Sequence, residues 1–202
     1  MKATRVFQLS ADHVALDFVN TLDDRFVPDV QVEKLESYAD VLSFAGQTRT
    51  LTAAQVSSLS RLAMNGNPSH ALRAGIELRE VLARIFYSMV KRQRVAGGDL
   101  QDFNERLRQA SRHRVLCEQA GHFAWRWEGL DRELEAPLWP VVQQAADLLA
   151  SPNVKFVRAC GRESCRWLFL DTSKNHSRRW CDMKVCGNRV KARRYYALHG
   201  RE

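Results

Sequence analysis

Four cysteines near the end of the chain restrict its fold more than any other feature. They form two equal pairs, Cys160-x4-Cys165 and Cys181-x4-Cys186, with fifteen residues between the pairs. In a reducing compartment such paired thiols bind a metal more often than they form disulfides. Zn²⁺ accepts four thiolates at the corners of a tetrahedron, with sulfur about 2.3 Å from the metal. The spacing therefore predicts one structural zinc ion held by all four cysteines.

Two other interpretations of the cysteines are an iron–sulfur cluster and four unrelated buried thiols. Iron–sulfur sites usually contain Cys-x2-Cys steps, whereas both pairs here have four intervening residues. His176 or His199 could replace a cysteine, but four intact thiols make this unnecessary. The fifth cysteine, Cys117, is expected to be a small core residue within a strand rather than a ligand.

Charge is distributed unevenly along the chain. The formal net charge is +8, and residues 155–202 contain 13 basic and 4 acidic residues, out of 31 and 23 in the whole chain. Such asymmetry indicates a segment that binds a polyanion, most often nucleic acid, with a solvated basic tail as the alternative. DNA is the expected partner, and RNA stays open.

The segment 187–199, directly after the last cysteine, is predicted to form a basic helix. Its apolar stripe is too narrow for an ordinary core helix, and one of its two tyrosines is expected to pack onto the zinc module. Arginine and lysine contact phosphates, and arginine also recognises guanine. The residues predicted to contact nucleic acid are Arg178, Arg179, Lys184, Arg189, Lys191, Arg193 and Arg194.

The first 150 residues are predicted to be mostly helical. Apolar periodicity indicates helices over residues 15–22, 33–45, 53–63, 68–90 and 137–150, and Asp99 is expected to cap a further one. Thr52 and Gln55 fit a capping box. Alternating Phe123, Trp125 and Trp127 predict one strand of a β-hairpin that turns at residues 118–121.

The expected fold class is therefore mainly α with a small β-hairpin (α+β). A helical domain, residues 1–150, would be followed by a small four-cysteine zinc module, residues 154–202, that ends in the basic helix, with the break at residues 151–153. The module has few apolar residues, so zinc should supply much of its folding free energy, and zinc removal should unfold it first.

Membrane and enzyme classes are not supported by the sequence. No apolar run approaches the ~18 residues of a membrane span, and the first residues lack the apolar centre of a secretory signal, so a cytoplasmic protein is expected. Phosphate-binding loops, the dinucleotide fingerprint and the zinc-protease and serine-hydrolase motifs are missing, so no enzyme is expected.

The cysteine segment closely resembles the CGNR zinc finger, which is named after the tetrapeptide that here is Cys186-Gly-Asn-Arg189. The resemblance also rests on the first cysteine pair, on residues 167–171 and on residues 178–183. Upstream, residues 16–22 and the long helix at 72–90 resemble the ABATE domain that usually precedes this finger. The resemblance implies a bacterial, stress-induced transcription regulator whose finger binds zinc and DNA.

The N-terminal domain would then sense a small-molecule effector or mediate homodimerisation. Asp17, Asn20 and Thr21 could line a ligand pocket, or they could cap and brace helices, which is the preferred interpretation. Two alternative functions are a zinc-stabilised protein-interaction module with an acidic partner, and a thiol redox sensor that ejects zinc and releases DNA on oxidation.

Overall fold

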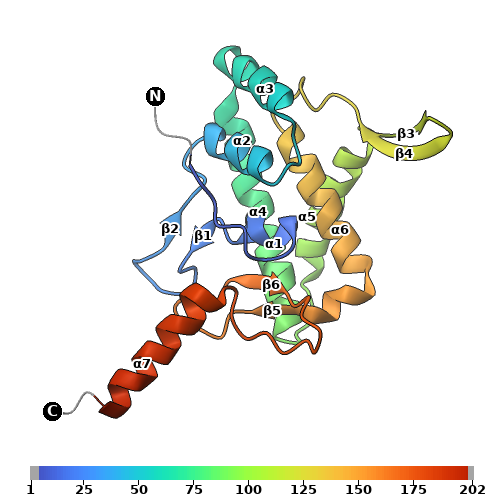
Figure 1. Cartoon of the computed structure of the whole chain (residues 1–202). Coiled ribbons are helices and arrows are strands. Elements are labelled where there is room, and N and C mark those ends of the chain that lie inside the picture. The colour runs from blue at the N-terminus through green and yellow to red at the C-terminus, as the bar shows by residue number, and fades with distance from the viewer. Residues whose placement is uncertain (1–4, 200–202) are drawn as a thin grey trace.

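The computed structural model describes residues 5–199, which form a helical body with three small two-stranded sheets (Figure 1). The α-helices are α1 (Val14–Val19), α2 (Tyr38–Gln47), α3 (Ala53–Asn65), α4 (Pro68–Val90), α5 (Gly97–Ser111), α6 (Trp139–Ala150) and α7 (Asn188–His199). The strands are β1 (Leu22–Asp23), β2 (Val32–Glu33), β3 (Arg114–Gln119), β4 (His122–Trp127), β5 (Val157–Ala159) and β6 (Leu168–Leu170). This architecture confirms the mainly α fold class with a small β-hairpin.

The body is organised around α4, which packs against α1, α2 and α5. The helix begins where the sequence predicts, because the Asn67 side chain accepts a hydrogen bond from the His70 amide and Pro68 needs no donor in the first turn. Leu78, Leu82 and Phe86 are fully buried along one side of the helix. No helix among the described residues is long and apolar enough to cross a membrane.

Of the other two N-caps predicted from the sequence, one is confirmed and one is wrong. The capping box of α3 is confirmed, since Thr52 and Gln55 exchange side-chain-to-backbone hydrogen bonds. The prediction that Asp99 caps a helix is wrong, because α5 begins at Gly97 with Ala96 as its N-cap. Asp99 lies in the first turn, and its carboxylate pairs with Arg84 of α4 at 2.6 Å.

A buried arginine ties β2 to the long helix. Arg79 is 2% exposed, and its guanidinium donates two parallel hydrogen bonds to the Glu33 carboxylate, at 2.5 and 2.7 Å. Its Nε atom also donates to Glu80. A charge can be buried in this way only when it is paired and hydrogen-bonded, so the pair fixes the β1–β2 segment on α4.

The segment 157–170 is attached to the helical body rather than standing as a separate tail. β5 and β6 pair antiparallel, and Leu168 and Phe169 are fully buried in the same apolar cluster as α1 and α4. The Asn20 side chain both donates to the Leu168 carbonyl and accepts from the Leu168 amide, each at 2.9 Å. In addition, the Leu170 amide donates to the Ala11 carbonyl at 2.8 Å. Part of the cysteine segment therefore shares its core with α1.

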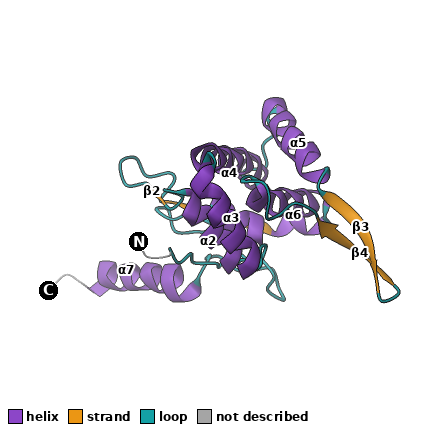
Figure 2. Ribbon diagram, turned by 90° about the horizontal axis from the view of Figure 1, so that it is seen from above, coloured by secondary structure: helices purple, strands orange, loops and turns teal. Residues whose placement is uncertain are grey.

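The β3–β4 hairpin and α7 extend from opposite sides of the body in both views (Figures 1 and 2). The hairpin turns at Ala120 and Gly121, which both have positive φ, as a two-residue turn of this kind requires. Cys117 lies in β3 and is partly exposed, so the expectation that it is a core residue is wrong.

The Asn20 contact generates a test of how firmly the cysteine segment is held. Asn20→Ala would leave the buried amide and carbonyl of Leu168 without partners, which costs about 3 kcal/mol. We expect the free energy of unfolding, measured with denaturant, to fall by about this amount. Asn104→Ala, on the exposed side of α5, is the matched control and should change little. A loss for Asn20→Ala no larger than the control's would contradict this role.

Candidate metal centre and basic groove

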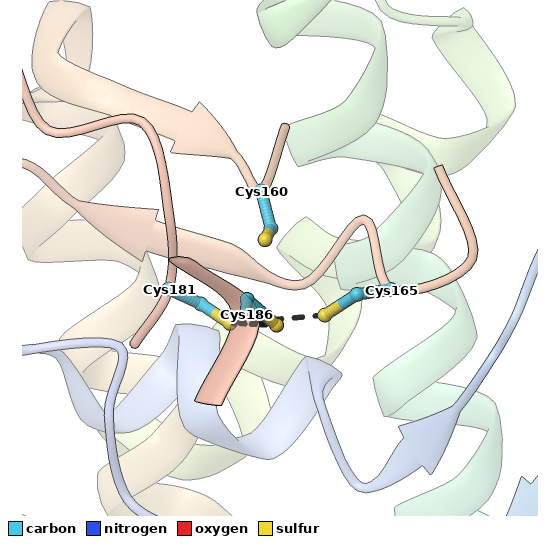
Figure 3. A group of neighbouring side chains, drawn as sticks. All are labelled: Cys160, Cys165, Cys181 and Cys186. Atoms are coloured by element: carbon cyan, nitrogen blue, oxygen red, sulfur yellow. Dashed lines mark hydrogen bonds between the residues drawn. The ribbon is translucent and has the colours of Figure 1, made fainter. Parts of the chain in front are cut away.

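The four paired cysteines come from three separate pieces of backbone. Cys160 follows β5, and Cys165 lies in the turn before β6. Cys181 lies just before the π-helical turn Met183–Gly187 that leads into α7, and Cys186 lies within that turn. Figure 3 shows the four side chains pointing toward one another. All four are buried, and their sulfur atoms lie within 4.8 Å of one another.

The sulfur geometry fits a tetrahedral zinc ion. The Sγ atoms of Cys165 and Cys181 are 3.7 Å apart, and those of Cys181 and Cys186 are 3.6 Å apart. A tetrahedron with metal–sulfur bonds of about 2.3 Å has sulfur–sulfur edges of about 3.8 Å. Thiolates are ligands that zinc prefers, and four of them complete its coordination. The cluster is therefore a four-cysteine site for one structural zinc ion, as the spacing predicts.

Backbone hydrogen bonds hold the two cysteine loops in place. The Cys160 amide donates to the Trp167 carbonyl at 2.7 Å, and the Gly161 amide donates to the Arg179 carbonyl at 2.8 Å. The Asp182 carboxylate accepts from the Lys184 and Val185 amides and so caps the π-helical turn. These bonds connect the first cysteine loop to the segment before Cys181 and shape the turn that carries Cys186.

Little space is left around the residue directly after the fourth cysteine. A Cβ atom at Gly187 would overlap the Met183 sulfur and come within 3.2 Å of the Trp180 ring. Real Cβ contacts are rarely this close, so a larger residue would have to displace side chains beside the metal centre. The close approach of Met183 and Trp180 therefore accounts for glycine as the second residue of the Cys186-Gly-Asn-Arg189 tetrapeptide.

The four thiols shift one another's pKa values because they lie so close together. The pKa of Cys160 is lowered to about 2, chiefly because the Cys165 and Cys181 side chains hydrogen-bond to it. The pKa of Cys165 is raised to about 12, chiefly by its hydrogen bond to Cys160, and the pKa of Cys181 is raised for the same reason. Burial raises the pKa of Cys186. Four thiolates can coexist here only around a cation that compensates their charge.

Cationic side chains lie next to the cluster. A cavity of about 220 Å³ is lined by Cys165, Cys181 and Cys186 together with Arg162 and Arg189. The Nε atom of Arg162 is buried and has no hydrogen-bond partner among the described residues. An Nη atom of the same guanidinium lies 3.8 Å from a carboxylate oxygen of Asp24. Zinc with four thiolates carries a formal charge of −2, and the cavity beside it is lined by these two guanidinium groups and by the carboxylates of Asp23 and Asp24.

Arg178 belongs to the contact between the cysteine segment and the body. Its Nε atom donates to the Trp180 carbonyl at 2.9 Å and one Nη atom donates to the Ser10 carbonyl at 2.8 Å. The same group also contacts Asp12 and the Cys181 carbonyl. The sequence predicts Arg178 on the nucleic-acid surface, but its guanidinium is occupied by these internal contacts.

The other predicted basic residues lie on the surface at or beside α7. Arg179, Lys184, Arg189, Lys191 and Arg193 are exposed, while the side chain of Arg194 lies outside the described part of the structure. A groove of about 720 Å³ runs between α7 and the first cysteine loop, residues 160–165. Its lining includes Arg162, Arg179, Arg189 and Arg193, and also Glu163 and Trp180. Sequence reasoning missed Trp180 as a groove residue, although its position directly before Cys181 was a usable signal.

Both tyrosines of α7 are exposed. Tyr195 is 60% and Tyr196 is 70% exposed, and Tyr195 stacks on the His199 ring at 4.5 Å. The expectation that one of them packs onto the zinc module is therefore wrong. The helix carries too narrow an apolar stripe to bury either ring, as its sequence indicates.

The three predicted pocket residues are buried and already hydrogen-bonded. One Asp17 carboxylate oxygen accepts from the Ser10 and Ala11 amides, both at 3.0 Å, and the Thr21 hydroxyl donates to the Phe18 carbonyl at 2.8 Å. Asn20 makes the two bonds to Leu168 described above. These contacts favour the bracing role, and a ligand pocket at Asp17, Asn20 and Thr21 stays a prediction.

Fold and site together define a zinc-finger protein in which the finger is attached to a helical domain. Comparison with family models agrees with this class. The CGNR zinc finger model matches residues 157–199, and the ABATE model, described as "Putative stress-induced transcription regulator", matches residues 12–152. This protein belongs to the ABATE family and carries a CGNR zinc finger. Neither family is described as an enzyme family, and no curated protein sequence matches the chain.

The metal centre generates a direct prediction. Cys181→Ser removes one of four ligands, so we expect the zinc content, measured by elemental analysis of reduced protein, to fall from about one equivalent to nearly none. The near-UV circular dichroism should change with it, because Trp180 and Trp167 lie beside the cysteines. Cys117→Ser, outside the cluster, is the control and should keep both. Reduced wild-type protein without stoichiometric metal would overturn the assignment.

Asp17 generates a prediction about pH. Burial raises its pKa to about 6, from 3.8 for the free side chain. A raised carboxyl pKa favours the protonated folded form, so this stability contribution is complete below pH ~4 and is lost as the pH rises through 6. Asp17→Asn keeps an oxygen acceptor without the charge. Its stability relative to wild type should therefore rise by about 1 kcal/mol between pH 5 and pH 7.5 in denaturant unfolding; a constant difference would contradict this.

Proposed function

We propose that this protein regulates transcription in the cytoplasm by binding DNA in the basic groove beside α7. The observation that carries the proposal is the groove itself, in which four guanidinium groups outnumber the single carboxylate of Glu163. Arginine pairs with phosphate through two parallel hydrogen bonds and can read guanine in the major groove. Arg179, Lys184, Arg189, Lys191, Arg193 and Arg194 make the contacts, while Arg178 supports the finger from within.

The shape of the protein supports this proposal. α7 extends away from the body (Figures 1 and 2), and Arg189, Lys191 and Arg193 on it are exposed. A single helix that projects in this way can enter the major groove of DNA, whose width is about 12 Å. Exposed Tyr195 and Tyr196 then lie where they contact sugars or bases.

Zinc controls this surface through shared residues. Arg162 and Arg189 line both the cavity beside the sulfur atoms and the DNA-binding groove. Loss of the ion therefore displaces two of the four arginines at once. In this proposal the metal takes no part in chemistry; it holds the loop and α7 at a fixed separation so that the charges face one ligand.

The helical body, residues 1–150, has the regulatory role in this proposal, through a small-molecule effector or through pairing of two copies. One buried contact between this body and the finger joins Asn20, at the end of α1, to Leu168, and Tyr87 of α4 also donates to the Arg166 carbonyl. An effector that bound one arrangement of α1 better than another would shift the finger with it, because a ligand moves an equilibrium by its difference in affinity for the two states.

The proposal predicts salt-sensitive DNA binding that depends on the groove. Arg179→Ala combined with Arg193→Ala, two groove residues that do not line the cavity beside the sulfur atoms, should keep one zinc equivalent but weaken binding to a labelled DNA duplex by about tenfold or more, measured by fluorescence anisotropy. The slope of log affinity against log salt should become shallower by about 2, because two phosphate contacts are lost. Arg126→Ala, on the hairpin at the opposite side of the molecule, is the control.

Several outcomes would contradict DNA binding. Wild-type affinity in the double variant would mean that another surface makes the contact, and affinity that hardly changes with salt would exclude phosphate-led binding. Stronger competition by RNA than by the same DNA sequence would favour RNA. Absence of any nucleic-acid binding would favour the protein-interaction module, and zinc release by mild peroxide that abolishes binding would add a redox function.

A further inference from the structure

The β3–β4 hairpin exposes large apolar side chains that the helical body does not cover. Leu116 is 55%, Phe123 is 73% and Trp125 is 61% exposed. Leu116 lies directly opposite Trp125, and Glu118 opposite Phe123, so these side chains share one face of the hairpin. Contiguous exposed apolar side chains of this size mark interaction surfaces, and tryptophan, phenylalanine and arginine are enriched at such surfaces.

The base of the hairpin is fixed to the body. The Glu128 amide donates to the His113 carbonyl at 2.8 Å, and the His113 ring stacks on Trp139 at 3.6 Å. Beyond this base the sheet has no third strand among the described residues. A two-stranded hairpin alone in water is marginally stable, and its free edges can pair with another strand. The hairpin is therefore held in position with both edges open.

The phase of the hydrogen bonds identifies which residues of β3 face outward. In an antiparallel pair, hydrogen-bonded and non-hydrogen-bonded residue pairs alternate along the strands. Because His113 bonds to Glu128, the β3 residues whose backbone groups bond to β4 are residues 115, 117 and 119. The backbone amides and carbonyls of Arg114, Leu116 and Glu118 then point away from β4. These three residues form the free edge of β3.

We propose that two copies of this chain pair through β3, antiparallel, about a two-fold axis at Leu116. In this register Leu116 lies opposite Leu116 of the second copy, and all three outward-facing residues meet outward-facing partners. Arg114 then lies opposite Glu118, and by symmetry Glu118 lies opposite Arg114. Opposite charges at directly facing positions stabilise a strand pair, and each such pair also exchanges two backbone hydrogen bonds.

Charge complementarity selects β3 over β4 for this contact. The outward edge of β4 carries Phe123, Trp125 and Trp127, and the same two-fold pairing about Trp125 brings no opposite charges together on that face. In the single chain, the Arg114 guanidinium lies 4.8 Å from the centre of the Trp125 ring and 5.9 Å from that of Trp127. The β3 pairing leaves these contacts within each copy in place. The result is a continuous four-stranded sheet with the two Leu116 side chains at its centre, flanked by Trp125 of each copy.

A dimer of this kind would place two DNA-binding helices in a fixed two-fold relation. The hairpin and α7 lie on opposite sides of the body (Figures 1 and 2), so the contact leaves both basic grooves free. Dimeric regulators of this symmetry bind sites with two related halves. The dimer does not require the groove to bind DNA, so either proposal can fail while the other stands.

Charge-swapped variants test the pairing and its register together. Arg114→Glu places two carboxylates opposite each other at both ends of the interface, and Glu118→Arg places two guanidinium groups there. Each single variant should weaken dimerisation about tenfold or more, because both ion pairs of the interface become repulsive. An equimolar mixture of the two single variants should form a heterodimer, because every facing pair is then again of opposite charge. Light scattering and sedimentation measure the masses.

The mixture also shows that each variant is folded, since a misfolded hairpin could not re-form the complex. Arg126→Ala, on the other face of β4, is the control and should dimerise as wild type does. The proposal is overturned by a monomeric wild type at tens of micromolar concentration, by single variants that dimerise as wild type does, or by a mixture that stays monomeric. Dimers that survive both charge changes would point to pairing through β4 or through another surface.

Discussion

The arrangement of the C-terminal segment depends on the repulsion between four buried thiolates. Their sulfur atoms lie within 4.8 Å of one another, so the cysteines cannot all lose their protons unless a divalent cation lies between them. With the ion in place, the same closeness becomes the source of stability, since two loops and the start of α7 are joined at one point. A small number of apolar residues in the finger is then sufficient.

The finger is nevertheless not independent of the rest of the molecule. Asn20 bonds to both backbone groups of Leu168, and Arg178 reaches from the finger to the Ser10 carbonyl. Leu168 and Phe169 complete a core that begins in α1. The ABATE match ends at residue 152 and the finger match begins at residue 157, but the free energy that holds the finger is shared across that boundary.

What the sequence could predict was determined by the range of each signal. The α3 capping box and the start of α4 depend on residues a few positions apart, and the zinc ligands form two short pairs within one segment; these predictions are confirmed. The errors involve distant partners. Asp99 resembled an N-cap but pairs with Arg84, and Cys117 resembled a core residue but lies on a hairpin that projects from the body. The contact of Arg178 with the Ser10 carbonyl could not be predicted either, because only the fold brings these two residues together.

The exposure of α7 also affects how it binds. Its twelve residues form too short a segment for strong helicity by themselves, the apolar stripe is narrow, and its cations repel one another along the helix. In the proposed complex with DNA, the phosphates would remove that repulsion and favour the helical form of α7. Part of the gross attraction is then offset by lost conformational entropy. In this proposed complex, the ordering cost lowers the affinity that the charges alone would give.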